Sequence, residues 1–177
     1  MADKPMPLLG KTSDGDIVSV EQFTPRVLTQ IAGWANFAQA SDAALRRLLL
    51  HLPEDYRTPV RHGADVVWRI APTKVLVSSA VHPDVSDLPD FVALDLSDAR
   101  TGVILHGPGA AGLLARLAAI DFSERSFPSG SFVQTGIHHV GVLIDRLSND
   151  RFDLLIPTTW ADTLLDLIGC HLGSADA

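Results

Sequence analysis

The order of apolar segments in the C-terminal half most constrains what this chain can fold into. Beyond residue 90, two successions of strand, strand and helix follow each other, separated by turns rich in Gly, Pro, Ser, Asn and Asp. Helices packed on a mainly antiparallel sheet make an α+β domain, and this is the fold class that we expect. The predicted elements are strands at 91–97 and 101–106 that pair with each other, a helix at 110–120, a long strand at 132–147 that can bend at Gly136 or Gly141, a strand at 152–156 after a hairpin turn, and a last helix that Thr158 or Thr159 caps.

The N-terminal half adds a strand, a helix and a hairpin to this pattern. Apolar residues between 27 and 33 fall on both phases of the alternation, which suits a strand better than a helix. Ser41 precedes a run of strong helix formers that stops at Pro53, so we expect Ser41 to be the N-cap of a helix. Residues 64–70 and 74–79 flank a short turn that contains Pro, and this arrangement predicts a hairpin.

The length of 177 residues favours a single domain, which can bury a substantial core without disulfides. Residues 1–16 have turn-forming composition and little apolar periodicity, so we expect a flexible tail there. A single α+β domain is predicted over residues 17–172. Residues 173–177 form a polar C-terminal end.

Charge and composition argue against several classes of function. The net charge of −7 offers no field for phosphates, so we expect neither nucleic-acid binding nor attachment to an anionic membrane surface. The nearest candidate for a membrane span, residues 109–120, is too short and carries Arg116. A single cysteine, Cys170, and an N-terminus without signal-peptide layout favour the cytoplasm. The hydrophobic content of 46% and the mean hydropathy of +0.19 indicate apolar surface that packs against another chain.

A glycine pattern between a predicted strand and a predicted helix raises the possibility of a dinucleotide site. Residues 107–112 match G-x-G-x-x-G, in which main-chain N–H groups and the helix dipole would hold a pyrophosphate. A Rossmann unit also needs a parallel strand that ends in Asp or Glu about 20 residues further on. Residues 131–133 occupy that place without an acid, so we interpret the pattern as an ordinary strand-to-helix turn.

Other candidate groups lack the partners that their chemistry needs. His138 and His139 would point to opposite faces of a strand and cannot share one metal ion. Cys170 has only His171 as a basic neighbour and is expected to be a packed, inert thiol. The serines lie outside any G-x-S-x-G elbow, and the scattered aspartates form no acid–base pair. We therefore predict no catalytic, cofactor-binding or metal-binding residue in this chain. The three tryptophans, Trp34, Trp68 and Trp160, are interpreted as core or interface anchors, with core burial favoured.

Several segments together resemble a known family. They are residues 93–110, 114–117, Asp121, 128–130 and 145–155. In order and spacing they are similar to the folate-binding fold of the aminomethyltransferases. Within that group, residues 48–53, 67–72 and 132–140 look most like the gamma subunit of heterotetrameric sarcosine oxidase. The resemblance spans about residues 31 to 168.

This resemblance implies a non-catalytic, structural subunit of an oxidoreductase complex. Such a complex oxidatively demethylates sarcosine, or a related N-methyl amino acid, and passes the one-carbon unit to tetrahydrofolate. The resemblance implies alpha, beta and delta subunits as partners. It places NAD and folate in alpha, FAD in beta, FMN between alpha and beta, and zinc in delta, so no cofactor is expected in this chain.

One departure from the catalytic aminomethyltransferases supports the structural role. Their corresponding strand carries an aspartate that orients folate or amine, whereas residues 138–144 contain no carboxylate. The alternative hypothesis is a small stand-alone folate-binding or aminomethyltransferase-like protein, which would need a cavity with an acid or a reactive thiol. A weaker third possibility is a nucleotide-binding module at residues 107–112.

Overall fold

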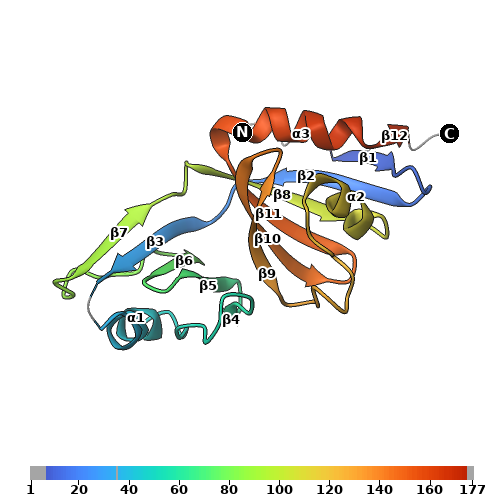
Figure 1. Ribbon diagram of the computed structural model, residues 1–177. Coiled ribbons are helices and arrows are strands. Elements are labelled where there is room, and N and C mark those ends of the chain that lie inside the picture. The colour runs from blue at the N-terminus through green and yellow to red at the C-terminus, as the bar shows by residue number, and fades with distance from the viewer. Residues whose placement is uncertain (1–6, 35, 175–177) are drawn as a thin grey trace. The chain divides into compact units, whose positions relative to one another are not determined.

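The computed structural model describes residues 7–34 and 36–174, and this part of the chain divides into two compact units (Figure 1). Unit 1 combines the N-terminal part, up to Thr24, with the C-terminal part, from Ala99. Unit 2 is the segment between them, Pro25–Asp98. We predicted one domain over residues 17–172, and the structure has two units because each contains a sheet with its own apolar core. Residues 1–6 and 175–177, within the predicted tail and polar end, lie outside the described residues.

Unit 1 is built on a seven-stranded sheet in which all neighbouring strands are antiparallel. The order across the sheet is β12-β1-β2-β8-β11-β10-β9. The strands are β1 (Leu8–Lys11), β2 (Ile17–Phe23), β8 (Arg100–His106), β9 (Phe132–Ile137), β10 (Val140–Ser148), β11 (Arg151–Pro157) and β12 (Gly173–Ser174).

The prediction of a flexible tail over residues 1–16 is wrong for residues 8–11. These residues form β1, which pairs with β2 on one side and with the two residues of β12 on the other. A four-residue strand is too short to show apolar periodicity, and one of its partners lies more than 160 residues away. The sequence around β1 therefore predicts turns from its composition and gives no signal that the segment pairs as a strand.

Two helices complete unit 1. They are α2 (Ala110–Leu117) and α3 (Ala161–Cys170), and their buried leucines share one core with Val103 and Leu105 of β8. The predicted helix at 110–120 is confirmed as α2, although it ends at Leu117. The predicted cap of the last helix is wrong, because no side chain caps it and a 3₁₀ turn, η1 (Thr158–Trp160), leads into α3 instead. The main-chain N–H of Thr158 donates a hydrogen bond to the carbonyl of Ala99 at 3.1 Å.

Unit 2 is a five-stranded antiparallel sheet in the order β4-β5-β6-β3-β7, with one helix. Its core joins Phe37 and Leu45 of the helix to Ile31, Val67, Val75 and Val77 of the sheet. The predicted hairpin of residues 64–70 and 74–79 is confirmed as β5 paired with β6. The elements are β3 (Val27–Gly33), α1 (Phe37–Arg46), β4 (Val60–His62), β5 (Asp65–Ala71), β6 (Lys74–Ser79) and β7 (Phe91–Asp95).

The predicted start of α1 at Ser41 is wrong. Ser41 lies within the helix, is fully buried, and donates its hydroxyl to the carbonyl of Phe37 at 2.5 Å. A serine inside a helix can satisfy its hydroxyl on the preceding turn, so its presence does not by itself mark a cap. The helix ends at Arg46, and Asp42 accepts the N–H of Leu52 from the chain that follows it.

The predicted pairing of residues 91–97 with 101–106 is also wrong. Both segments are strands, but β7 pairs with β3 in unit 2, whereas β8 pairs with β2 and β11 in unit 1. Alternation of apolar residues is a local property that identifies a strand without naming its partner. The chain passes from one unit to the other at Asp98, where we expected a hairpin turn.

The predicted long strand at 132–147 is two strands joined by a tight turn. His138 and His139 connect β9 to β10, and both have positive φ angles, 48° and 70°. Positive φ at both central residues is the geometry of a two-residue hairpin turn that Asn and Gly usually occupy. The next predicted hairpin, at residues 148–150, is confirmed as β10 paired with β11. No helix in the described part of the chain has the length and apolar character that crossing a bilayer requires.

Candidate functional site

A polar cluster in unit 1 centres on Arg146, a residue of β10 that is buried in the apolar core. Its side chain is 4% exposed, and its guanidinium carbon lies 5.0 Å from the centre of the Phe152 ring. A buried guanidinium is tolerated only when its N–H groups are paired, and each of the five has an acceptor here. The acceptors are the carbonyls of Ser148 (3.2 Å), Phe122 (2.9 Å), Phe127 (2.5 Å) and Asn149 (2.9 Å), and the carboxylate of Glu124 (3.0 Å).

The Arg146 cluster fixes the loop between α2 and β9. Ser129 donates its N–H and its hydroxyl to the Glu124 carboxylate, at 3.0 and 3.3 Å. The main chain of Arg146 exchanges hydrogen bonds with the same loop, accepting from Gly130 at 2.7 Å and donating to Ser131 at 2.8 Å. Arg146 therefore connects β10, the β10–β11 turn and the loop.

Asp121 stabilises the start of the same loop. Its carboxylate accepts the hydroxyl of Ser126 at 2.6 Å and the N–H of Ser123 at 2.9 Å. These hydrogen bonds favour the ionised form and lower the pKa of Asp121 below its ordinary value. The residues that carry the family resemblance in this region thus maintain the fold.

The glycine-rich turn does not offer room for a pyrophosphate. A side chain added at Gly109 would lie 2.7 Å from Thr12, 2.8 Å from Val18 and 3.0 Å from Asp16. The N–H groups of Gly109 and Ala110 already donate to main-chain carbonyls. The start of α2 is thus filled by the β1–β2 loop and faces Asp16, and the sheet is antiparallel, whereas a Rossmann unit needs parallel strands.

The structural environments of the two adjacent histidines and of the cysteine differ from those predicted. His138 and His139 occupy a hairpin turn rather than a strand, with ring centres 5.9 Å apart. Within the described residues, no group of three or more His, Cys, Asp or Glu side chains could hold a metal ion. Cys170 is exposed at the end of α3, so the prediction of a packed thiol is wrong.

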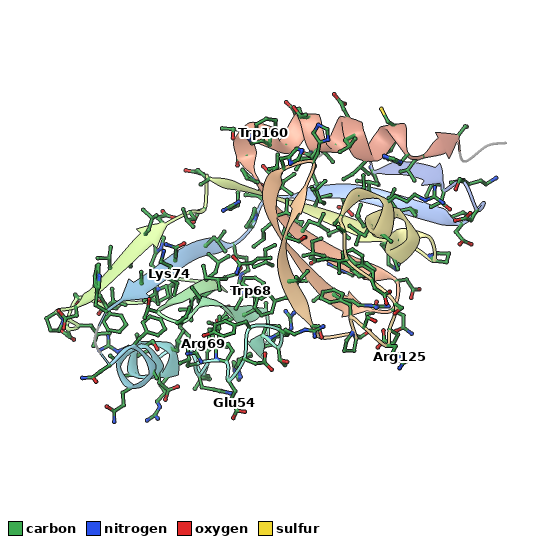
Figure 2. The ribbon with its side chains drawn as sticks, in the orientation of Figure 1. Glu54, Trp68, Arg69, Lys74, Arg125 and Trp160 are labelled. Carbon is green, nitrogen blue, oxygen red and sulfur yellow. The ribbon has the colours of Figure 1, made fainter. Side chains whose placement is uncertain are left out.

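The three tryptophans divide between core and surface, and Figure 2 labels two of them, Trp68 and Trp160. Trp68 on β5 is buried, as favoured by the sequence. Trp160 precedes the first turn of α3 and is about half exposed, and Trp34 is 71% exposed. Core burial is therefore wrong for Trp34 and Trp160, which leaves them available as interface anchors.

Unit 2 contains a polar cluster that sequence spacing did not reveal. The Thr29 hydroxyl lies 2.9 Å from Nδ1 of His82, and Nε2 of His82 lies 3.6 Å from the Asp95 carboxylate. Asp95 accepts the hydroxyl and the N–H of Ser97 at 2.6 and 2.9 Å, and these bonds lower its pKa. Thr29 and Asp95 face each other across β3 and β7, while His82 comes from the loop after β6.

The arrangement of Thr29, His82 and Asp95 is similar in composition to a nucleophile–base–acid triad, but its geometry does not suit acyl transfer. The Thr29 side chain is buried, so a substrate carbonyl has no access to its hydroxyl. The imidazole instead fixes the loop after β6 to the sheet. No signal in the sequence could have identified this cluster, because 53 residues separate Thr29 from His82.

Comparisons with known proteins identify the fold. No model of a protein family matches the chain, and a search of curated proteins gave no match. Eighteen chains of solved structures match. One belongs to the structure of heterotetrameric sarcosine oxidase from Corynebacterium sp. U-96 in complex with pyrrole 2-carboxylate, with a TM-score of 0.76 and 18% identity over 86% of this chain and 82% of that chain. Another is the glycine cleavage system aminomethyltransferase T from Bartonella henselae, with a TM-score of 0.53 and 17% identity over 84% of this chain and 44% of that chain.

These similarities establish the class of fold. The chain has the α+β fold that aminomethyltransferase T and a chain of heterotetrameric sarcosine oxidase share, and the predictions of fold class and of structural resemblance are confirmed. The particular structure with the higher TM-score is the sarcosine oxidase chain. At identities of 17% and 18%, the similarity concerns the fold alone.

Proposed function

We propose that this chain is a non-catalytic structural subunit of a cytoplasmic, heterotetrameric sarcosine oxidase-like complex. The observation that carries the proposal is the extent of the structural match with one chain of such an oxidase. The match covers 86% of this chain and 82% of that chain, whereas it covers only 44% of aminomethyltransferase T. A match that extends over most of both chains favours an oxidase subunit over an aminomethyltransferase, of which less than half is matched.

The use of polar side chains within unit 1 supports a non-catalytic role. Every N–H of the Arg146 guanidinium is engaged by main-chain or loop acceptors, and the Asp121 carboxylate is engaged by two serines. Groups already satisfied within a loop are poor candidates for binding a substrate, because they would first have to lose these hydrogen bonds. We assign no catalytic, cofactor-binding or metal-binding residue to the chain.

In this proposal the chemistry belongs to the partner chains. Alpha, beta and delta subunits would hold NAD, tetrahydrofolate, FAD, FMN and zinc, and the complex would demethylate sarcosine or a related N-methyl amino acid. The apolar residues that remain about half exposed or more, Trp34, Trp160, Val92 and Leu94 among them, are the type of surface that permanent complexes cover.

The test compares the isolated chain with the chain purified from its native host through an affinity tag. We expect the isolated chain to carry no flavin absorption, to leave sarcosine unchanged and to release no heat on titration with tetrahydrofolate. From the host, it should elute with flavin-bearing chains and with sarcosine oxidation. Flavin or tetrahydrofolate bound by the isolated chain would contradict the proposal, and folate binding without any partner would favour the stand-alone alternative.

A further inference from the structure

The two sheets have four edge strands, which differ in the features that prevent pairing with another strand. At the ends of the unit 1 sheet, β12 has two residues, and β9 has Gln134, Thr135 and Gly136 at its centre. At one end of the unit 2 sheet, β4 has three residues, follows Pro59 and carries Arg61. Short length, polar composition, charge and proline are the means by which proteins protect edge strands.

The other end of the unit 2 sheet, β7, has the weakest protection, because it contains no proline and its one charged residue, Asp95, stands at its end. Its five residues read Phe-Val-Ala-Leu-Asp, and its register with β3 is continuous, without a bulge. Val92 and Leu94 are each 52% exposed. An exposed, regular and apolar edge of this kind is suited to pairing with an additional strand.

The hydrogen bonds that flank β7 show which main-chain groups face outward. Leu96 donates its N–H to Leu28 at 2.7 Å, and Trp34 donates to Asp90 at 3.3 Å. In an antiparallel pair, bonded and non-bonded residue pairs alternate, so Val92 and Leu94 direct their main-chain groups toward β3. Ala93 and Asp95 therefore direct theirs to the free edge.

The same register places three large apolar side chains on one face. Val92 pairs with Ala32, and the Trp34–Asp90 hydrogen bond continues this pairing by two residues. Residues two apart on a strand share a face, so Trp34 lies on the face that carries Val92 and Leu94. A tryptophan beside two aliphatic residues is the composition of an interface centre.

The charge around β7 identifies the kind of occupant. Residues 75–99 contain five aspartates, of which Asp84 and Asp87 are paired with Arg47. Asp90 and Asp95 stand at the two ends of β7, and both are exposed. A second copy of the chain would bring the same acidic segment against this one, whereas a strand flanked by Lys or Arg complements it.

We infer that the free edge of β7 binds an extended segment of a different protein chain. The segment adds a strand beside β7, pairs with the main chain of Ala93 and Asp95, and covers Trp34, Val92 and Leu94 with apolar side chains. Lys or Arg residues of the segment lie near Asp90 and Asp95. This inference rests on the proposed function only in that it requires a partner chain.

The test measures hydrogen exchange of the full-length chain, alone and in the flavin-bearing complex purified from the host. We expect the amides of Ala93 and Asp95 to exchange at least about tenfold more slowly in the complex. Ala93→Pro removes an outward N–H without removing a bond to β3, so it should weaken association at least about tenfold. Ala93→Thr, which keeps the N–H and suits a strand, is the matched control and should change association less than about twofold.

Two further variants keep the test decisive if Ala93→Pro does not fold. Leu94→Lys and Asp90→Lys leave the main chain unchanged. Leu94→Lys should weaken association by removing an apolar contact. Asp90→Lys should weaken association and reduce its dependence on salt concentration. A flavin-bearing complex in which β7 exchanges as fast as in the free chain overturns this inference and leaves the proposed function intact. Absence of any complex overturns both the inference and the proposed function. A symmetric dimer protected at β7 overturns the inference, because the occupant is then a second copy of this chain.

Discussion

Each unit of the chain contains a polar cluster that holds a loop against a sheet, and the two clusters differ in burial. In unit 1, the Arg146 side chain is 4% exposed and each of its N–H groups has an acceptor. In unit 2, the side chains of His82 and Asp95 are 52% and 59% exposed, and their nearest N and O atoms lie 3.6 Å apart. A buried charge requires complete pairing, whereas an exposed one can rely on water.

This difference implies unequal contributions to stability. Removing one partner of a buried charge leaves groups without hydrogen bonds, which costs several kcal/mol. Pairs exposed to solvent contribute about 0–1 kcal/mol, because water replaces the lost partner. The comparison therefore predicts a large effect of mutation in unit 1 and a small effect in unit 2.

The largest effect is expected from Arg146→Met. The substitution removes all five hydrogen bonds and leaves the carbonyls of Phe122 and Phe127 unpaired in the core. We expect the free energy of unfolding to fall by about 3–5 kcal/mol, measured by urea denaturation followed by circular dichroism. Arg125→Met, on the same loop but at an exposed position (Figure 2), is the matched control and should change stability by less than about 0.5 kcal/mol. Equal effects of the two substitutions would contradict the structural role of Arg146.

A smaller effect is expected from Glu124→Gln, which alters the exposed end of the same cluster. The Glu124 carboxylate is 53% exposed, and its bonds to Arg146 and Ser129 weaken when its charge is removed. Solvent screens this end, so the free energy of unfolding should fall by about 0.5–1.5 kcal/mol. The measurement is the shift of the urea midpoint at constant slope. A loss as large as that of Arg146→Met would show that the ion pair, rather than the carbonyl bonds, dominates the cluster.

The sequence predicted those parts of the fold that depend on local signals. The hairpins β5–β6 and β10–β11 were predicted because turn residues and apolar alternation lie next to each other in the chain. The pairing of β7 was missed because its partner β3 is distant in sequence, and β1 was missed because a strand of four residues is too short to show apolar periodicity. The turn at His138 and His139 was missed because two non-glycine residues with positive φ are uncommon.

The two polar clusters were accessible to the sequence to different degrees. Arg146 and Asp121 lie in segments that carried the family resemblance, although their structural role becomes clear only from their acceptors. Thr29, His82 and Asp95 come together through the pairing of β3 with β7 and the path of the loop after β6. No spacing rule connects such residues, so this cluster could be found only in three dimensions.

In unit 2, Thr29→Val should have an effect below that of any change to Arg146. Valine keeps the shape of the buried side chain and removes the hydroxyl that contacts His82. The half-exposed imidazole can then bond to water, so we expect a loss of about 1 kcal/mol or less. Hydrogen exchange of residues 80–90 reports whether the loop after β6 loosens. A loss above about 3 kcal/mol would remove the distinction between the two clusters.

The smallest effect is expected from the acid dependence of Asp95. Hydrogen bonds from Ser97 lower the pKa of Asp95 in the folded state, so the unfolded state binds more protons where the two states differ. The stability contributed by Asp95 is therefore present above about pH 4 and is lost as the pH falls through the lowered pKa. Asp95→Asn removes this titration, and the variant should lose less stability than the wild type on acidification below about pH 4.

Asp121→Asn is the counterpart in unit 1, because hydrogen bonds from Ser126 and Ser123 lower the pKa of the Asp121 carboxyl. Both carboxylates are surrounded by solvent on their remaining sides. The two Asn variants should therefore show an equal reduction in the acid dependence of stability, whereas the substitutions at Arg146 and Thr29 have unequal effects. A steeper acid response in Asp95→Asn would show that its carboxylate destabilises the folded state.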